Sequence, residues 1–482
     1  MSRADPNLPY GPDLDRCAAE ADALMEGVSR LDAAVAKRFT FHHRRYRGMT
    51  GQQVLAAGPT LGDARDVVAS QEAFTDWASL ERFADGLRQE ANSPSALFER
   101  AARLVVDGRA DELRALLKRS PKLAGVRSPR RHGGSLWHYL AANGVEDSMQ
   151  RVTASAVDVA DALTQAGVPV DEPCNVYGGG PGSTPLVALV SSCHPADAGV
   201  QVPLVKAFVR AGANPEGIDN DGLPLRVALG FRYPAAANAL AESGARPRDL
   251  PSAAGVGDVG AVVEFLSPES GRVSQACEFP NPTHDPLPAG VAPLPPEVMR
   301  QALVFAAMAG EVALVDRFLS LGVLPNGGPR RDIGPLHEAA FQGHREVVDR
   351  MIAGGGDPTR RDSMWDSTAI GWADGGGRRE LIDHLFAVGP VDIRDAVELQ
   401  RPDVVGRLLA ADPSLADGPD GDGCLLRTAA FHGDSASVRV LLAAGAQREL
   451  RGELGVTAAE YARRGGHDAV AALLRGGDTA PA

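Results

Sequence analysis

The chain has 482 residues and carries 62 aspartates and glutamates against 49 lysines and arginines, which gives a formal net charge of −13. This surplus of acid argues against a general nucleic-acid binder and against a binder of anionic membranes. There is no run of about 18 apolar residues, the first residues do not resemble a secretory signal, and the five scattered cysteines suit reduced thiols, so we expect a cytoplasmic protein.

The first 92 residues predict helices that lie outside any repeat. Apolar residues at helical spacing over residues 12–40 predict one long amphipathic helix. Residues 61–90 predict two more helices, which are joined near Trp77. We assign residues 1–92 to a helical cap, because the terminal unit of a stacked array would otherwise expose an apolar face.

Residues 93–267 contain degraded copies of a helix pair, and two insertions interrupt them over residues 133–203. Four polar residues lie close in sequence within this irregular region: His138, Tyr139, Asn143 and Glu146. An enzyme or small-molecule binder with a polar pocket in this region is therefore an alternative that stays open.

Three short motifs in the first half of the chain could suggest phosphate binding, nucleophilic catalysis or metal binding, but each matches the required pattern poorly. The glycine-rich residues 177–183 lack the Lys-Ser/Thr pair of a P-loop and carry a proline where a phosphate cradle needs a free N–H. Adjacent residues such as Cys193 and His194 rarely align as nucleophile and base. His42 and His43 would point about 100° apart on a helix, so we interpret them as an exposed basic helix end without an acidic partner. We expect no catalytic residue, no metal site and no cofactor.

Residues 268–297 differ from the rest of the chain because they contain eight prolines. Such a composition favours an extended or disordered insertion, which we expect to divide the repeats into two halves. The second half then covers residues 298–475, and residues 476–482 form a disordered tail.

The second half repeats a pattern that is clearest over residues 333–362. Its marker is Gly343, which Gly310 precedes by 33 residues and Gly377 follows by 34. Pro335 suits the first turn of a helix, small residues keep that helix narrow, and Gly343 ends it. A second helix follows, with an apolar stripe that must face a neighbour. A regular period of this kind indicates stacked units that are each too small to bury their own apolar face.

The pattern resembles the ankyrin repeat, whose family motif is T-P-L-H-x-A-A-x-x-G-H. The matching residues are Gly334, Pro335, Leu336, His337, Ala339, Ala340, Gly343 and His344, with only the threonine missing. The resemblance is strong over residues 300–475 and weaker over 95–266, and we count eleven copies. It implies an all-α ankyrin-repeat solenoid, in which His138 and His337 each tie a turn to its neighbour by a hydrogen bond. Two copies, near Leu250 and Ala396, follow at a shortened step and predict lost hairpin loops.

The resemblance also implies a concave groove, lined by the hairpin tips and by the two residues before each marker position. Those pairs are Met308 and Ala309, Phe341 and Gln342, Glu398 and Leu399, and Phe431 and His432. Exposed phenylalanine and methionine in a row would anchor a partner. The alternative interpretation is a set of singly scattered surface hydrophobes, which are common on proteins.

Two arginine pairs are further candidates for partner binding: Arg330 and Arg331, and Arg360 and Arg361. They lie 30 residues apart before consecutive repeats, so we expect them to project from neighbouring hairpins. Arginine suits carboxylate or phosphate groups on a partner. Solvated surface charge is the alternative.

Together these observations predict a monomeric, non-catalytic scaffold that binds another protein through its concave groove. Besides the enzyme alternative, an immunity-type inhibitor that blocks one toxin or enzyme would have the same sequence features. The chain prefers arginine strongly over lysine, which indicates a GC-rich, bacterial genome.

Overall fold

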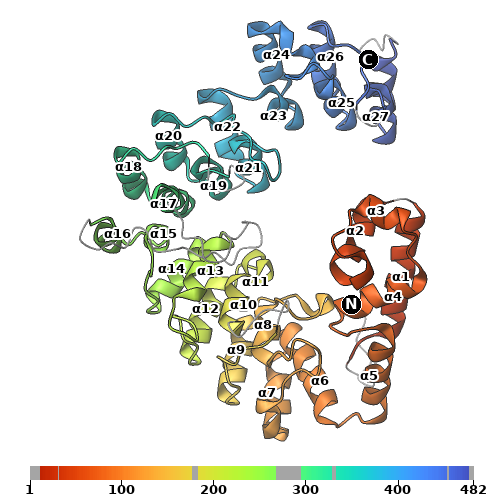
Figure 1. Cartoon of the computed structure of the whole chain (residues 1–482), viewed down its shortest axis with the longest axis vertical. Coiled ribbons are helices and arrows are strands. Elements are labelled where there is room, and N and C mark those ends of the chain that lie inside the picture. The colour runs from red at the N-terminus through yellow and green to blue at the C-terminus, as the bar shows by residue number, and fades with distance from the viewer. Residues whose placement is uncertain are drawn as a thin grey trace. The chain divides into compact units, whose positions relative to one another are not determined.

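The computed structural model describes residues 11–30, 32–175, 183–267, 295–327, 333–452 and 455–476. Within these ranges every regular element is helical and no β-strand is present, which confirms the all-α prediction (Figure 1). The chain divides into two compact units. We call the described residues up to Arg248 unit 1 and those from Asp249 onward unit 2.

The helices of unit 1 are α1 (Leu14–Ser29), α2 (Ala33–His42), α3 (Gly51–Ala56), α4 (Leu61–Gln71), α5 (Trp77–Gln89), α6 (Pro94–Val106), α7 (Ala110–Arg119), α8 (Leu136–Ala141), α9 (Ala156–Gln165), α10 (Pro185–Val190), α11 (Cys193–Asp197), α12 (Gln201–Arg210), α13 (Leu223–Gly230) and α14 (Pro234–Glu242). Those of unit 2 are α15 (Leu250–Gly255), α16 (Val259–Leu266), α17 (Pro295–Ala309), α18 (Val312–Ser320), α19 (Pro335–Gln342), α20 (Arg345–Ala353), α21 (Ala369–Gly375), α22 (Arg379–Val388), α23 (Ile393–Glu398), α24 (Pro402–Ala411), α25 (Cys424–Phe431), α26 (Ser435–Ala443), α27 (Ala458–Arg464) and α28 (Asp468–Leu474).

The N-terminal segment begins with two helices where the sequence predicted one. The Asp32 carboxylate accepts hydrogen bonds from the backbone N–H groups of Ala34 at 2.9 Å and Val35 at 3.1 Å, and so starts a new helix. A Cβ on Gly27 would lie 2.6 Å from a methyl carbon of Val35, so the glycine lets α1 and α2 approach closely. The prediction of a single helix was wrong because the apolar spacing continues across this cap.

The rest of the N-terminal segment follows the sequence-based prediction. Helices α4 and α5 are the two helices expected over residues 61–90, and α5 begins at Trp77. Asp76 caps α5 by accepting a hydrogen bond from the backbone of Ser79 at 2.7 Å. Phe39, Tyr46 and Leu80 belong to one apolar core, which holds the segment together. Its role as a cap stays a prediction.

From α6 onward, the described helices other than α11 form eleven consecutive pairs, four in unit 1 and seven in unit 2. Within unit 2, α19 packs on its partner α20 and also on α17 and α21, the first helices of the adjacent pairs (Figure 1). Ala339 and Ala340 are fully buried, and Gly343 ends α19 with φ +87°. One apolar core runs through all seven pairs of unit 2. The first helices α15, α17, α19 and α21 therefore pack on one another in chain order, as do α23, α25 and α27.

Two buried histidines connect consecutive turns in the way the motif implies. The Nδ1 atom of His337 accepts a hydrogen bond from the Gly334 N–H at 3.0 Å, and its Nε2 donates to the Arg360 carbonyl at 3.0 Å. In unit 1, His138 bonds Ser135 at 3.0 Å and the Ser183 carbonyl at 3.1 Å. Burial lowers the pKa of His138 to about 4, which keeps the neutral ring that accepts at one nitrogen and donates at the other.

The boundary between the units lies earlier in the chain than the sequence suggested. The proline-rich residues were expected to divide the repeats, yet the units separate between Arg248 and Asp249. Helix α15 packs on α17, and Leu250 shares a core with Ala302, on the far side of the proline-rich stretch. That stretch, apart from residues 295–297 in α17, and the expected tail, apart from Gly476, lie outside the described residues. The boundary between the two units therefore lies next to Leu250, where the spacing between consecutive repeats is shortened.

Among the described repeats of unit 2, one carries a residue other than glycine at the marker position. Gln400 has φ +53°, a left-handed conformation that costs a side-chain-bearing residue about 1 kcal/mol. We expect Gln400→Gly to raise the free energy of unfolding by up to about 1 kcal/mol and Gly377→Gln, at φ +69° with open space around it, to lower it by a similar amount. Urea unfolding of both variants tests this, and equal midpoints would contradict it.

Candidate functional site

An aromatic patch is the main surface feature of unit 2, and it consists of Phe341, Trp365 and Trp372. The Trp372 ring forms its floor and is 5% exposed. Edge-to-face contacts join it to Phe341, with ring centroids 6.0 Å apart, and to Trp365, with centroids 5.2 Å apart. Trp365 is 55% exposed and Phe341 is half-buried. Trp365, on the loop between α20 and α21, and Phe341, at the end of α19, therefore both pack against the buried Trp372 ring of α21.

The loop that carries Trp365 is organised around one buried carboxylate. Asp362 accepts hydrogen bonds from the backbone N–H groups of Met364 and Trp365, both at 2.8 Å, and of Ser367 at 3.2 Å. It also accepts from the indole N–H of Trp372 at 3.0 Å. Burial alone would raise the pKa of Asp362, but these four donors lower it instead. The Asp362 carboxylate thus fixes the backbone of Trp365, and the Trp372 ring packs against its side chain.

The structure revises the row of groove residues that the sequence proposed. Met308 is 1% exposed and packs in the core, so it is not a surface anchor. Phe341 and Gln342 are half-buried at the end of α19. Phe431 is 52% exposed, and its ring centroid lies 5.6 Å from that of His432 and 6.5 Å from that of a neighbouring tyrosine. Met308 lies at the end of α17, which packs on both α15 and α19, and its carbonyl is bonded by the His344 ring at 3.0 Å.

The second group of candidates, the arginines, also divides into different roles. Arg330 and Arg331 lie outside the described residues. Arg360 is exposed. The Arg361 guanidinium pairs with Asp366 at 3.0 Å and with Asp392 at 2.9 Å, so it joins the loops of two consecutive repeats. Arg361 is therefore a structural cation and not the free rim charge that the sequence suggested.

A buried acid beside Arg361 makes the stability of this region depend on pH. Burial raises the pKa of Asp395 to about 6, although the Thr368 hydroxyl donates to it at 2.5 Å. Because the folded-state pKa lies above the unfolded value, the stabilising contribution is complete below about pH 4 and is lost as pH rises through about 6. We expect Asp395→Asn to gain up to about 3 kcal/mol relative to the native chain between pH 4 and 7.

Urea unfolding of both chains at pH 4 and pH 7 measures this difference. Asp374→Asn, at an exposed position of α21, is the matched control and should follow the native chain at both pH values. Parallel pH dependence of the Asp395→Asn variant and the native chain would contradict the expectation.

Glu146 of the irregular region belongs to a buried charged network that is centred on Arg130. The Arg130 guanidinium donates to Glu99 at 2.8 Å, to the Glu72 carboxylate at 3.2 Å and to the Glu72 carbonyl at 2.7 Å, and it also pairs with Glu146. Burial would raise the pKa of Glu146, but Arg130 and His132 lower it to about 2. All four side chains of the Arg130 network, which comprises Arg130, Glu72, Glu99 and Glu146, are at most 5% exposed.

The four polar residues that suggested a pocket are engaged within the fold. His138 ties two turns together, Tyr139 donates to the Glu146 carboxylate at 2.8 Å, and Asn143 donates to the Ser191 hydroxyl at 2.8 Å. His138, Tyr139 and Glu146 are at most 1% exposed. These three side chains are therefore not placed to contact a substrate from solution.

The short motifs are placed as follows. His43 is half-buried and lies 3.4 Å from the Asp63 carboxylate on α4, so the expectation of an exposed helix end without an acidic partner was wrong. Cys193 is exposed at the start of α11. All but the last residue of the glycine-rich 177–183 stretch lie outside the described residues.

Among the residues that the structure describes, no group of three or more His, Cys, Asp or Glu side chains is arranged to hold a metal ion. None of the described helices is long and apolar enough to span a bilayer.

Sequence reasoning missed Trp365, Trp372 and Asp362. The available signal was that two of the four tryptophans of the chain lie seven residues apart, and that the first of them follows Asp362 by three residues in a turn-forming stretch. The roles of these three residues depend on which N–H groups donate to the Asp362 carboxylate. The spacing of residues in the sequence does not show which groups these are.

Comparison with known proteins places one repeat in a family. The Ankyrin repeat family model matches residues 333–363. No curated protein matches the chain. Among solved structures, a chain from the predatory endopeptidase Bd0816 of Bdellovibrio bacteriovorus in complex with the immunity protein Bd3460 is similar, with 21% identity over 36% of this chain and 97% of that chain, and a TM-score of 0.29. A likeness at this TM-score carries no argument about fold or function.

Proposed function

We propose that this chain is a non-catalytic ankyrin-type solenoid that binds another protein through unit 2, with the aromatic patch as its central contact. The observation that carries the proposal is Trp365, which is 55% exposed and yet held by the Asp362 turn. A rigid, half-exposed tryptophan is costly to leave in water, and tryptophan is enriched among the few residues that dominate binding energy at interfaces. The Ankyrin repeat match over residues 333–363 supports a binding role for this stretch.

The partner surface in this proposal extends from the aromatic patch to Phe431. Phe431 occupies the position in its repeat that Phe341 occupies in an earlier one, and both lie at the end of a first helix. His432 lies 3.4 Å from the Glu398 carboxylate and is in ring contact with Phe431, so polar groups border the second anchor. Apolar anchors bordered by polar groups are typical of protein interfaces. We propose that the protein acts in the cytoplasm, as a monomer and without a cofactor.

Comparative capture tests the proposal. The native chain, Trp365→Ala and Phe41→Ala are immobilised separately, and proteins retained from the producing cells are quantified by mass spectrometry. Phe41 is the matched control, because it is an aromatic residue 71% exposed in unit 1. We expect at least one protein to be retained by the native chain and by Phe41→Ala and to be depleted with Trp365→Ala. Equal recovery with all three chains would overturn the role of the aromatic patch.

A further inference from the structure

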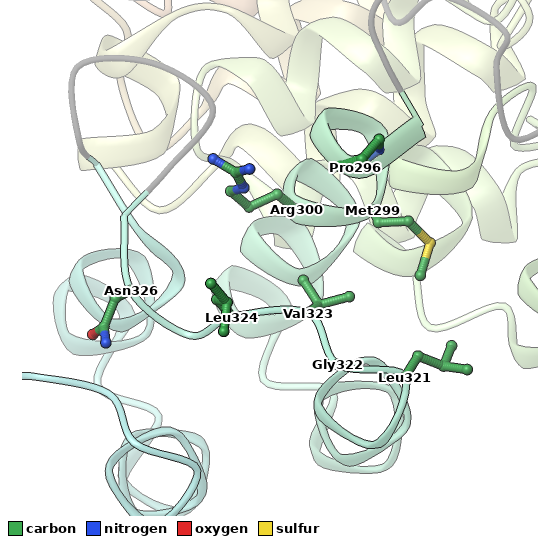
Figure 2. Close-up of a pocket in the computed structure, with 8 residues that line it drawn as sticks. All are labelled: Pro296, Met299, Arg300, Leu321, Gly322, Val323, Leu324 and Asn326. Carbon is green, nitrogen blue, oxygen red and sulfur yellow. The ribbon is translucent and has the colours of Figure 1, made fainter.

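Unit 2 contains a pocket that is separate from the aromatic patch. It has a volume of about 490 Å³, within the range of small-molecule sites, and lies between the first turns of α17 and the segment that follows α18 (Figure 2). Aliphatic groups of Met299, Leu321, Val323 and Leu324 form most of its wall. Leu321 is 45% exposed and Leu324 is 71% exposed. Two large aliphatic side chains are therefore left in water on one concave surface.

One cation lies on the wall of this pocket without a counter-ion. The Arg300 guanidinium makes no hydrogen bond or ion pair within the described part of the chain, although this chain has a surplus of acid. Figure 2 shows Arg300 and Met299 on one turn of α17, with the guanidinium toward the end that carries Leu324 and Asn326 and the thioether toward the end that carries Leu321. The pocket thus has a cationic end and an aliphatic end.

The other polar side chain in the wall is already used by the fold. The Asn326 amide donates to the Gly355 carbonyl at 2.9 Å and accepts from the Asp357 N–H at 2.7 Å, so the fold fixes its orientation. A single guanidinium matches one carboxylate in a bidentate pair, whereas a phosphate would need further donors. Among the lining residues that the structure describes there is no aromatic ring, which favours an alkyl chain over a planar ligand.

We propose that this pocket binds an aliphatic carboxylate of small-molecule size, with its carboxylate on Arg300 and its alkyl chain against Met299, Leu321 and Leu324. The alkyl chain covers the exposed leucines, and the carboxylate neutralises the unpaired cation. None of these residues belongs to the aromatic patch, so the site acts independently of the proposed partner surface.

Calorimetric titration of the full chain with decanoate tests the site. Decanol has the same chain without the charge, and acetate has the charge without the chain. We expect saturable binding of decanoate, at least 10-fold weaker binding of decanol, and no binding of acetate. Arg300→Gln should weaken decanoate about 10–100-fold and leave decanol within about twofold, as loss of a charge-assisted hydrogen bond predicts. Arg317→Gln, at an exposed arginine of α18, should bind decanoate like the native chain.

Three results would overturn the proposal: no saturable binding of decanoate, equal affinity for decanol, or equal weakening by Arg300→Gln and Arg317→Gln. Circular dichroism of each variant ensures that a loss of binding does not reflect unfolding. A peptide that ends in a free leucine carboxylate forms a final arm. If it binds more tightly than decanoate and its amide does not, the site belongs to a protein C-terminus and the small-molecule assignment is wrong.

Discussion

Replacing Arg130 by methionine is expected to destabilise unit 1 by about 3–5 kcal/mol, because the change leaves buried carboxylates without their cation. The Arg130 guanidinium reaches Glu72 at the end of α4, Glu99 on α6 and Glu146 after α8. Burial raises the pKa of Glu99 even with Arg130 present, so the ionised form of this acid depends on the arginine. The network joins the N-terminal segment to the first two helix pairs, and we expect all of these elements to loosen together.

Hydrogen exchange with mass spectrometry measures this effect locally. Peptides that cover α4, α6 and α8 should lose protection in Arg130→Met, whereas Arg119→Met, at an exposed position of α7, should exchange like the native chain. Adding Glu72→Gln, Glu99→Gln and Glu146→Gln to Arg130→Met should restore much of the protection, since neutral side chains no longer need the cation. Unchanged protection in Arg130→Met would mean that the network does not connect these elements.

A charge placed between the stacked first helices should be nearly as damaging. Ala340 is fully buried in α19, which packs on α17, α20 and α21. Ala340→Arg would overpack this contact and bury an unpaired cation, and we expect a loss of at least about 3 kcal/mol. Because each helix pair depends on its neighbours, the damage should spread to the adjacent pairs.

Thermal and urea unfolding test this expectation on the full chain. Ala353→Arg is the matched control, because Ala353 is exposed at the end of α20 in the same repeat, and a surface substitution there should change the stability by less than about 0.5 kcal/mol. A similar midpoint for both variants would show that α19 is not packed between its neighbours in solution.

The helix pairs were predictable from sequence because their signal is local and repeated. A proline in the first turn, paired alanines and a glycine with positive φ mark the clearest copy, and at Pro335, Ala340 and Gly343 the structure follows them. The break between α1 and α2 was not predicted, since the N-cap at Asp32 does not interrupt the helical spacing of apolar residues. The position of the boundary between the units depends on long-range packing of α15 on α17, which no local pattern encodes.

The candidate site was predictable only in part, because the exposure of a side chain depends on packing and not on a local sequence pattern. The offset from the marker position correctly located Phe341 and Phe431 at the ends of first helices. Exposure was not predictable in the same way: Met308 occupies the equivalent position and is buried. Trp365 lies in a loop between helices, and its presentation depends on the Asp362 hydrogen bonds.

Dissociation kinetics of the captured partner from the native chain and from Trp365→Ala test the central claim most directly. If the aromatic patch is the central contact, Trp365→Ala should lose about 1–3 kcal/mol of binding free energy, mainly as a dissociation rate about 5–150-fold faster. Phe341→Ala and Phe431→Ala should act in the same direction, and Phe41→Ala should match the native chain, with circular dichroism confirming that every variant is folded. A dissociation rate for Trp365→Ala equal to that of Phe41→Ala would contradict the claim that the partner binds at the aromatic patch.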